Sequence, residues 1–244
     1  MTSWRQVPAE INLPNDLVAL LDSHAECVVF RKNHVFGRQG RPCKNLWIIV
    51  SGQVLLSAEP DGGPHALHLL SSGDLFGTGI LGDDRVWLST SRAVSQGVAY
   101  RLSERMLNEL PAKCPQLLRA MLGLMVRRLD RANKRLELFS HSSPRDRILG
   151  ILKIWANQMG RPTEGGALVP FRLTQAQLGD LVGVSREAVS RALGSLESEG
   201  KVARKRGNGI WLSPEVLSSG SVAYLGISEF VTGVGVAVAT AIPI

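Results

Sequence analysis

The feature that most constrains the fold is a pair of short helical patterns joined by a glycine turn in residues 173–199. Thr174 is a good N-cap for the first helix, and Gly183 ends that helix and permits a tight turn. Ser185 caps the second helix. Its apolar stripe comprises Ala188, Val189, Ala192, Leu193 and Leu196. This pattern predicts a helix-turn-helix, whose second helix enters the major groove of DNA.

The exposed positions at the start of that second helix carry side chains that recognise bases. They are Arg186, Glu187, Ser190 and Arg191. An arginine donates two hydrogen bonds to O6 and N7 of guanine, and a glutamate accepts one from N4 of cytosine. The alternative is that these are ordinary solvated residues on a helical hairpin.

A basic hairpin follows the second helix. The turn Gly207-Asn208-Gly209 separates Val202–Arg206 from Ile210–Leu212, which predicts the wing of a winged helix-turn-helix. Nearby cations and helix-cap side chains are candidates for contacts with DNA phosphates, which supply affinity without sequence information. These candidates are Thr174, Gln175, Ser185, Lys201, Arg204, Lys205 and Arg206.

The net charge of +7 favours an acidic partner, with nucleic acid first and an anionic membrane second. Three scattered cysteines and the absence of a signal-peptide pattern at the N-terminus predict a cytoplasmic protein without a disulfide framework, and we expect no membrane partner. The sequence lacks a Walker loop and the HExxH and GxSxG motifs, so we expect no enzyme.

The N-terminal half predicts a β-rich domain. A short amphipathic helix over residues 11–23 precedes short apolar runs from Cys27 to Leu102, with turns at Asp61–Pro64 and Ser72–Asp74. Regularly spaced short strands are typical of a sandwich or a barrel.

A long helix is predicted to begin at Pro115, after a short helix that Ser103 caps. Its apolar positions alternate at spacings of four and three over about three heptads, as in a coiled coil. They are Leu118, Leu122, Met125, Leu129, Ala132, Leu136 and Phe139. We expect this stripe to pair with a second copy of the chain, and packing on its own barrel is the alternative. The charged positions between them are expected to form a solvated, mostly basic face: Arg127, Arg128, Asp130, Arg131, Lys134, Arg135 and Glu137.

Beyond the long helix, Ser143-Pro144 is expected to cap and begin another amphipathic helix. Residues 159–168 read as a loop rich in glycine and proline.

In this order of segments the chain resembles the Crp/Fnr family, that of the catabolite activator protein and the fumarate–nitrate reduction regulator. The resemblance covers roughly residues 15–212 and is carried by LWIIVSGQV, LLSSGDLFG and LTQAQLGDLVGVSREAVSRALGSLESEGKV. It implies an α+β fold with an N-terminal β jelly-roll of the cyclic-nucleotide-binding kind, a long dimerisation helix and a C-terminal winged helix-turn-helix. The expected boundaries are 1–113 for the sensor, 114–142 for the dimerisation helix, 143–212 for the DNA-binding domain and 213–244 for an extension of unknown role.

The resemblance also implies a homodimeric transcription regulator that binds double-stranded DNA. Arg186, Glu187 and Arg191 match the base-reading residues of the catabolite-activator branch, while Glu187, Ser190 and Arg191 fit the Glu-x-x-Ser-Arg pattern of the other branch. Half-sites resembling TGTGA or TTGA are therefore both open, spaced about one helical turn apart. RNA polymerase is a further expected partner, because the turn at 60–64 and the loop at 159–168 lie where this family often touches it.

The expected effector pocket departs from the family's cyclic-AMP cassette. The positions that match its Gly-Glu and Arg-Ser pairs are Gly77-Thr78 and Trp87-Leu88, so the carboxylate for the ribose and the guanidinium for the phosphate are missing. Cyclic AMP is therefore disfavoured, although a gap in the alignment would bring in Arg85. The pocket positions would suit a weakly polar, unidentified molecule: Gly77, Thr78, Trp87, Thr90 and Ser91.

A haem-responsive or redox-responsive member of the same family also fits the sequence. A haem sensor would use His24, His34, His65, His68 or His141, and a redox sensor would use Cys43 or Cys114. Three scattered cysteines cannot supply the four ligands of the iron–sulfur branch. A ligand-binding or scaffold protein without DNA recognition is the hypothesis from a different functional class.

Overall fold

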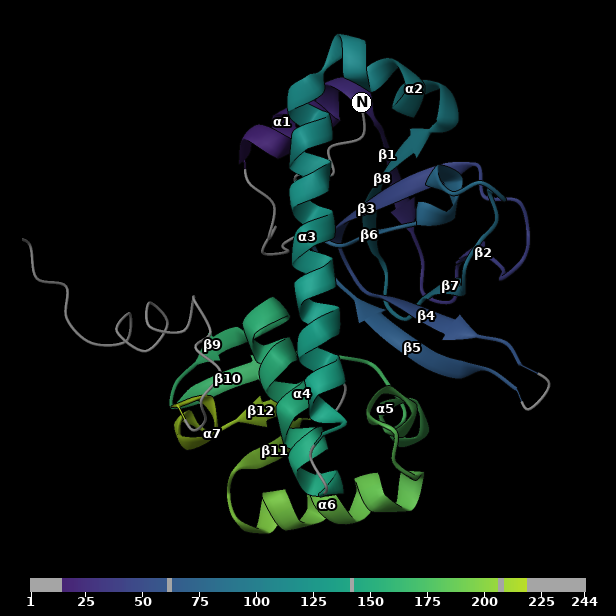
Figure 1. Ribbon diagram of the computed structural model, residues 1–244. Coiled ribbons are helices and arrows are strands. Elements are labelled where there is room, and N and C mark those ends of the chain that lie inside the picture. Colours follow the sequence, from purple (N-terminus) through teal and green to yellow (C-terminus); the bar gives the residue numbers. More distant parts are fainter. Residues whose placement is uncertain (1–14, 61–62, 141–142, 206–208, 219–244) are drawn as a thin grey trace, which may run out of the picture.

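The computed structural model describes residues 15–60, 63–140, 143–205 and 209–218, which form an N-terminal β domain, a long helix and a C-terminal domain (Figure 1). Two antiparallel four-stranded sheets build the N-terminal domain, in the orders β1-β8-β3-β6 and β2-β7-β4-β5. Of the sandwich and the barrel that the short strands predicted, the structure shows a sandwich of two sheets. The strands are β1 Glu26–Phe30, β2 Val35–Gly37, β3 Asn45–Ser51, β4 Val54–Ala58, β5 His65–Leu70, β6 Leu75–Phe76, β7 Thr90–Ala93 and β8 Gly97–Ser103.

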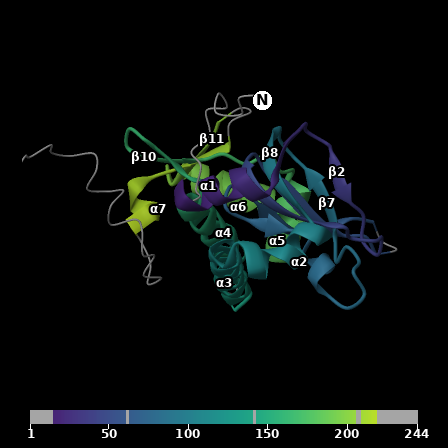
Figure 2. The ribbon, with the colours of Figure 1, turned by 90° about the horizontal axis from the view of Figure 1, so that it is seen from above.

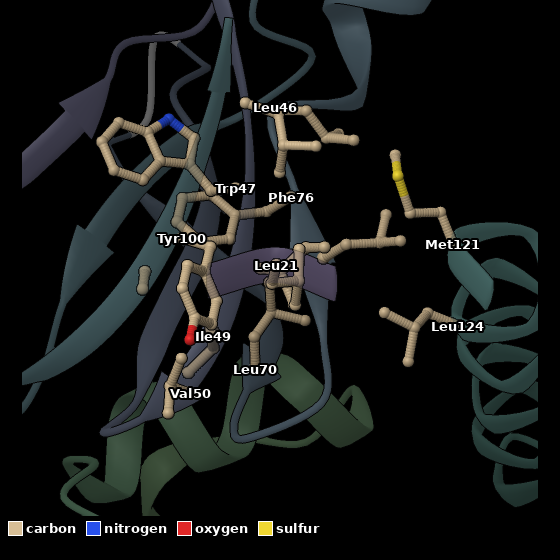
Figure 3. Close-up of a cluster of buried hydrophobic side chains, with 14 of the residues drawn as sticks. Leu21, Leu46, Trp47, Ile49, Val50, Leu70, Phe76, Tyr100, Met121 and Leu124 are labelled. Atoms are coloured by element: carbon tan, nitrogen blue, oxygen red, sulfur yellow. The ribbon is translucent and has the colours of Figure 1, made fainter. Parts of the chain in front are cut away.

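Strand β3 is buried along almost its whole length because apolar groups cover both of its faces. Figure 3 shows side chains of β3, such as Leu46 and Ile49, in one cluster with Leu21 of α1 (Asn15–His24) and with Met121 and Leu124 of the long helix. A run of alternating apolar and polar residues would expose one face of such a strand. The continuous LWIIV run thus indicates a strand that is covered from both sides.

Between β6 and β8, residues 77–96 are extended over a shorter length than the apolar run at 86–94 predicts. A 3-10 turn, η2 (Thr78–Leu81), and a loop occupy most of this stretch, and only β7 is extended. Gly79 permits the close approach, because a side chain there would overlap the carbonyl of Val86. The short strands β2 and β6 were not expected from the sequence either, since each has too few residues to give a periodic signal.

The helical segment begins as expected. The Ser103 hydroxyl caps α2 (Glu104–Lys113) by accepting from the backbone N–H of Met106 at 3.4 Å. The long helix α3 (Pro115–Leu138) has Pro115 in its first turn. No helix in the described part of the chain is long and apolar enough to cross a membrane.

The expected solvated face of α3 is partly wrong. Arg128, Arg131 and Arg135 turn inward toward the N-terminal domain, where Arg128 donates to the carbonyl of Leu75 at 2.8 Å and Arg131 pairs with Asp74. The sequence pattern could not distinguish these arginines from exposed Arg127, because the β5–β6 region supplies their partners from far along the chain.

The C-terminal domain combines helices with a four-stranded sheet in the order β11-β12-β10-β9. The expected loop at 159–168 is mostly a hairpin of that sheet, so this prediction was wrong. Pro144 begins α4, but Ser143 makes no side-chain cap hydrogen bond. The elements are α4 Pro144–Met159, β9 Arg161–Thr163, β10 Gly166–Val169, α5 Gln175–Val182, α6 Arg186–Ser198, β11 Val202–Lys205, β12 Gly209–Leu212 and α7 Pro214–Ser218.

The two domains pack together along α4 and α5. Helix α4 lies beside α3 (Figures 1 and 2), and α5 lies against β5 (Figure 1). Leu55 and Leu69 of the sandwich share one apolar cluster with Leu181 of α5. The carboxylate of Asp180 accepts from the backbone N–H of Ala66 at 3.0 Å and lies 3.6 Å from His65. A change in the sandwich can therefore reach the helix-turn-helix through direct contacts.

Candidate nucleic-acid interface and sensor pocket

Hydrogen-bonded caps fix the start of both helices of the helix-turn-helix, as the sequence predicted. Thr174 and Gln177 form a capping box: the Thr174 hydroxyl accepts from Gln177 N at 3.1 Å, and the Gln177 side chain accepts from Thr174 N at 2.9 Å. The Ser185 hydroxyl accepts from the backbone N–H of Ala188 at 3.1 Å. These caps orient the two helices without the help of DNA.

The turn between the helices depends on two glycines. Gly183 has φ of 66° and ends α5 in the left-handed region, which favours glycine. A Cβ on Gly179 would lie 2.5 Å from the carbonyl oxygen of Val184, so a side chain there would push the turn away. The close approach sets the angle at which α6 leaves α5.

The four expected base-reading side chains are exposed on the first turns of α6. Arg186, Glu187, Ser190 and Arg191 alternate with buried Val189 and Ala192, so the buried stripe holds the helix while the other face is free for a partner. Hydrogen bonds from its own backbone N–H and from Ser185 hold the pKa of Glu187 below its usual value, and Arg186 and Arg191 act in the same direction. At neutral pH this surface presents two cations beside one carboxylate.

The expected phosphate-contact residues lie in different environments. Thr174 and Ser185 are exposed at helix caps, Gln175 is half-buried, and Lys205 is exposed at the end of β11. Arg206 and the turn residues 207 and 208 lie outside the described residues.

Arg204 is held by Glu197 rather than projecting freely. Its guanidinium donates from Nε to one carboxylate oxygen at 2.8 Å and from Nη2 to the other at 2.5 Å. Its backbone N–H also donates to Glu197 at 3.1 Å. This ion pair with two hydrogen bonds, called here the Glu197–Arg204 fork, joins β11 of the wing to α6. The sequence pattern did not reveal it. Lys201 is similarly engaged, 3.1 Å from the carboxylate of Glu199.

One face of α3 is apolar and exposed in the single chain. Leu122, Val126, Leu129 and Leu136 are each more than half exposed. Of the expected stripe, Leu118 and Ala132 are half-buried, and Met125 packs toward the sandwich core. Val126 was missed because it falls outside the strict alternation of four and three. The exposed stripe is therefore rotated slightly from the one that the spacing indicated.

Phe139, the last residue of the expected stripe, contacts the helix-turn-helix of its own chain. A Cβ on Gly183 would lie 2.7 Å from the Phe139 ring, and the guanidinium of Arg147 lies 5.9 Å from the centre of that ring. The end of α3 thus touches the turn that sets the direction of α6.

Two of the expected effector-pocket residues, Gly77 and Trp87, lie beside a group of aromatic rings in the sandwich. Trp87 is buried over Gly37, where any side chain would overlap its indole ring. The Trp87 and Phe76 rings are 6.4 Å apart between centroids, and those of Phe76 and Trp47 are 6.2 Å apart. The labelled rings in Figure 3 show how Trp47 and Phe76 lie together inside the sandwich.

The polar side chains among the expected pocket residues are the short hydroxyl side chains of Thr78, Thr90 and Ser91. Thr90 accepts from the backbone N–H of Gln39 at 3.1 Å. Within the described part of the chain, Ser91 Oγ and Trp47 Nε1 are buried without a hydrogen-bond partner. Gly77 is buried at the start of η2, and Thr78 is half-buried beside it.

The expected pocket positions lack the charged groups that a cyclic nucleotide would require. None of the five expected positions carries a charge that would pair with a phosphate. Arg85, the residue that a shifted alignment would supply, lies at the surface and pairs with Glu104 of α2. A buried phosphate without a cation is costly.

The candidate histidine and cysteine ligands are scattered through the structure. His65 pairs with Asp180 while His68 bonds Arg135, so the two do not share a site, and His141 lies outside the described residues. The described residues contain no cluster of three or more histidine, cysteine or acidic side chains that could hold a metal ion. Burial raises the pKa of the Cys43 thiol, which donates to the carbonyl of Gly77 at 3.2 Å.

Comparisons with known proteins agree with this architecture. Residues 27–114 match the cyclic nucleotide-binding domain family, and residues 147–218 match the Crp-like helix-turn-helix domain family. The CRP-like cAMP-activated global transcriptional regulator of Mycobacterium tuberculosis is 30% identical over 198 residues, which cover 80% of this chain and 88% of that protein. The cyclic AMP receptor protein of Thermus thermophilus is 31% identical over 166 residues, covering 67% and 73%. In solved structures, the c-di-GMP responsive regulator CLP of Xanthomonas campestris has a similar fold, with a TM-score of 0.64 at 21% identity over 82% of this chain and 99% of that one.

Proposed function

Since the chain belongs to the Crp/Fnr family of transcription regulators, we propose that it acts as a homodimer on an inverted DNA repeat with TGTGA- or TTGA-like half-sites. Helix α6 enters the major groove, where Arg186, Glu187 and Arg191 contact base edges and Ser190 contributes a further polar contact. Lys205 and the cap residues of α5 and α6 contact phosphates.

The observation that carries this proposal is the surface of α6. Two arginines and one glutamate stand exposed on the first turns of a helix that is fixed at its N-terminus by Ser185 and at its base by a buried apolar stripe. The backbone of α6 is therefore ordered before DNA binds, so binding need not offset the entropy of forming this helix, although it still orders the exposed side chains.

Dimerisation through α3 accounts for its exposed apolar stripe. Leu122, Val126, Leu129 and Leu136 lie at helical spacings along one face, and burial against a second copy would remove them from water. Pairing the two α3 helices would relate the two α6 helices by a two-fold axis, which matches an inverted repeat.

The signal that regulates binding enters through the sandwich. We infer a weakly polar ligand, or a purely conformational signal, rather than cyclic AMP, because the expected pocket is aromatic and uncharged. The hairpin β9–β10 and the turn at 60–64 are proposed contacts for RNA polymerase.

The proposal is tested with the variant Arg191→Ala. Duplexes carrying every single-base change in each half-site are bound to the variant and to the parent protein. We expect the variant to lose discrimination at one base pair per half-site, by about 1–3 kcal/mol at each. Arg105→Ala removes an exposed arginine from α2 and should leave the base preferences unchanged. Full retention of discrimination in Arg191→Ala would contradict the assignment of α6 to the major groove.

A further inference from the structure

A small cavity lies where the sandwich, α3 and α4 meet, away from the aromatic interior and from α6. It measures about 40 Å³. Its polar lining comprises His68, Asp74, Arg128, Arg131, Arg135 and Gln158. These side chains come from β5, from the turn before β6, from α3 and from α4, so all three parts of the fold contribute to it.

The cavity carries more positive than negative charge. Asp74 is 1% exposed and is the single carboxylate of the lining, which also holds three guanidinium groups. Arg131 pairs with Asp74, and the same carboxylate accepts from Gln158 at 2.7 Å and from the backbone N–H of Ser71 at 2.9 Å. Among the described residues, Arg131 is thus paired with a carboxylate, whereas Arg128 and Arg135 are not.

The other two arginines bond neutral acceptors. Arg128 donates to the carbonyl of Leu75, and Arg135 donates to the carbonyl of Leu67 and, at 3.0 Å, to Nδ1 of His68. The Nε of Arg135 is buried without a hydrogen-bond partner in the described part of the chain. Burial lowers the pKa of each of the three arginines, which reflects the cost of holding these charges away from water.

His68 is arranged as a donor. Burial lowers the pKa of His68 to about 4, and the charges of Arg135 and Arg128 act in the same direction. The ring is therefore neutral at pH 7. Because its Nδ1 accepts from Arg135, its proton resides on Nε2, which is then a hydrogen-bond donor.

We infer that this cavity binds a phosphate-sized oxyanion. Two uncompensated guanidinium groups, the unpartnered Nε of Arg135 and the Nε2–H of His68 together supply the charge and the donors that such an anion requires. A cavity needs roughly 10–15 Å³ to hold one water, so about 40 Å³ accommodates a small ion and excludes a nucleotide base. The site goes beyond the proposed function, and an anion there would join α3 to α4 and so influence the position of the DNA-binding domain.

Calorimetric titration of the full chain with inorganic phosphate, in the absence of DNA, tests the site directly. Chloride at matched ionic strength is the reference. We expect saturable phosphate binding that Arg135→Gln weakens by at least about tenfold, since one charge-assisted contact is lost. Arg127→Gln removes an exposed arginine from the same helix and should bind phosphate like the parent chain. Equal binding by both variants, or no binding beyond the chloride reference, would overturn the inference.

Nuclear magnetic resonance of the parent chain keeps the test independent of how the variants fold. Phosphate should shift the ring signals of His68 and raise the pKa of His68. The ring signals of His65, on the same strand, should stay unchanged. Phenyl phosphate serves as a second probe: a response to both probes identifies the phosphoryl group of a larger molecule as an acceptable ligand, and a response to phosphate alone identifies the free ion. An unchanged His68 with both probes refutes the site, and this result is independent of whether the protein recognises DNA.

Discussion

At the scale of single residues, the role of a side chain depends more on the groups that it contacts than on its residue type. Arg191 and Arg204 lie 13 positions apart and would both be counted as basic DNA-contact candidates. Arg191 is exposed on α6, whereas Arg204 is held in a fork by Glu197. The same residue type is thus available to DNA in one case and occupied within the protein in the other.

Replacing Glu197 with glutamine should release Arg204. The fork is lost, so the guanidinium becomes available to a phosphate, and we expect non-specific DNA affinity to rise. The slope of log K against log salt should become steeper by about one unit, the contribution of one added phosphate contact. Filter binding across a salt series measures this slope.

Glu109→Gln is the matched control for this prediction. Lys113 and Arg105 hold the pKa of Glu109 low in the same way, but it lies on α2, so its loss should leave the salt slope unchanged. An unchanged slope in Glu197→Gln would show that Arg204 does not reach DNA when it is released.

His68 gives the protein a pH-dependent stability. Its pKa is about 4 in the folded state against an ordinary value of 6.5, so between these pH values the unfolded chain binds a proton that the folded chain does not. The contribution of His68 to the free energy of unfolding is fully present above pH 6.5. It is lost as the pH falls toward 4, and the loss is at most about 3 kcal/mol. Burial of the ring is the main cause of the lowered pKa, and the charges of Arg135 and Arg128 act in the same direction, while Arg131 and Asp74 line the same cavity as a mutual ion pair.

Urea unfolding of His68→Gln at pH 7 and pH 4.5 measures the effect. The variant should lose less stability on acidification than the parent chain. His34→Gln, at an exposed position, should lose as much as the parent. An equal loss in all three proteins would contradict the role given to His68.

The residue scale also shows what the sequence could predict. The caps Thr174 and Ser185 and the exposed positions of α6 follow from local spacing, because a cap and its helix are neighbours in the chain. The Glu197–Arg204 fork depends on how the wing folds back on α6, which no local pattern records.

At the scale of elements, α3 has two different faces. One face buries Leu117, Met121 and Leu124 against the sandwich, and the other exposes Leu122, Val126 and Leu129. The heptad spacing predicted an apolar stripe and the length of the helix, but it could not divide the apolar residues between the two faces. The exposed face becomes visible only when the sandwich occupies the other.

Leu129→Glu should convert the proposed dimer into a monomer. Leu129 is 62% exposed in the single chain, so the substitution should leave the fold of each protomer intact while placing a charge in the seam between two copies. Analytical ultracentrifugation should show a dimer dissociation constant at least about 100-fold higher than that of the parent chain.

Gln116→Glu adds the same charge to α3 outside the exposed stripe and should remain dimeric. If Leu129→Glu also remained dimeric at low micromolar concentration, the exposed face of α3 would not be the dimer interface.

The sequence predicted helix α5 correctly, but it predicted a loop where the hairpin β9–β10 lies. Helix α5 has an N-cap, an apolar stripe and a C-terminal glycine, all of which agree. The segment 159–168 carries two glycines in succession and a proline, which are typical of a loop, and yet its short strands pair with β12 and with each other. Pairing with a distant strand overrides the local preference.

At the scale of the whole molecule, a few polar residues connect parts that lie far apart in the sequence. Asp74, in the turn before β6, accepts hydrogen bonds from Arg131 of α3 and Gln158 of α4. Asp180 of α5 reaches back to His65 and Ala66 on β5. Through these hydrogen bonds and ion pairs, the sandwich contacts α3, α4 and the first helix of the helix-turn-helix directly, so a conformational change in the sandwich can alter the position of the DNA-binding domain.

The order of the sandwich, the long helix and the C-terminal domain along the chain was predictable from the sequence. The side-chain contacts between them were not. Turn residues, strand runs and the helical stripe each mark one part of the chain. The side chains that join the parts, such as Gln158, look like ordinary surface residues of an amphipathic helix until the two domains are placed together.

Selection of bound sequences from a random duplex pool decides whether this protein recognises DNA as a two-fold symmetric dimer. The full chain is used without any added ligand, after its folded and dimeric state has been established. We expect enrichment of an inverted repeat whose TGTGA- or TTGA-like half-sites are spaced about one helical turn apart, with binding that weakens as salt rises. Selection that enriches no inverted repeat, both from the chain alone and after a cell extract is added to supply an effector, would contradict the proposed function.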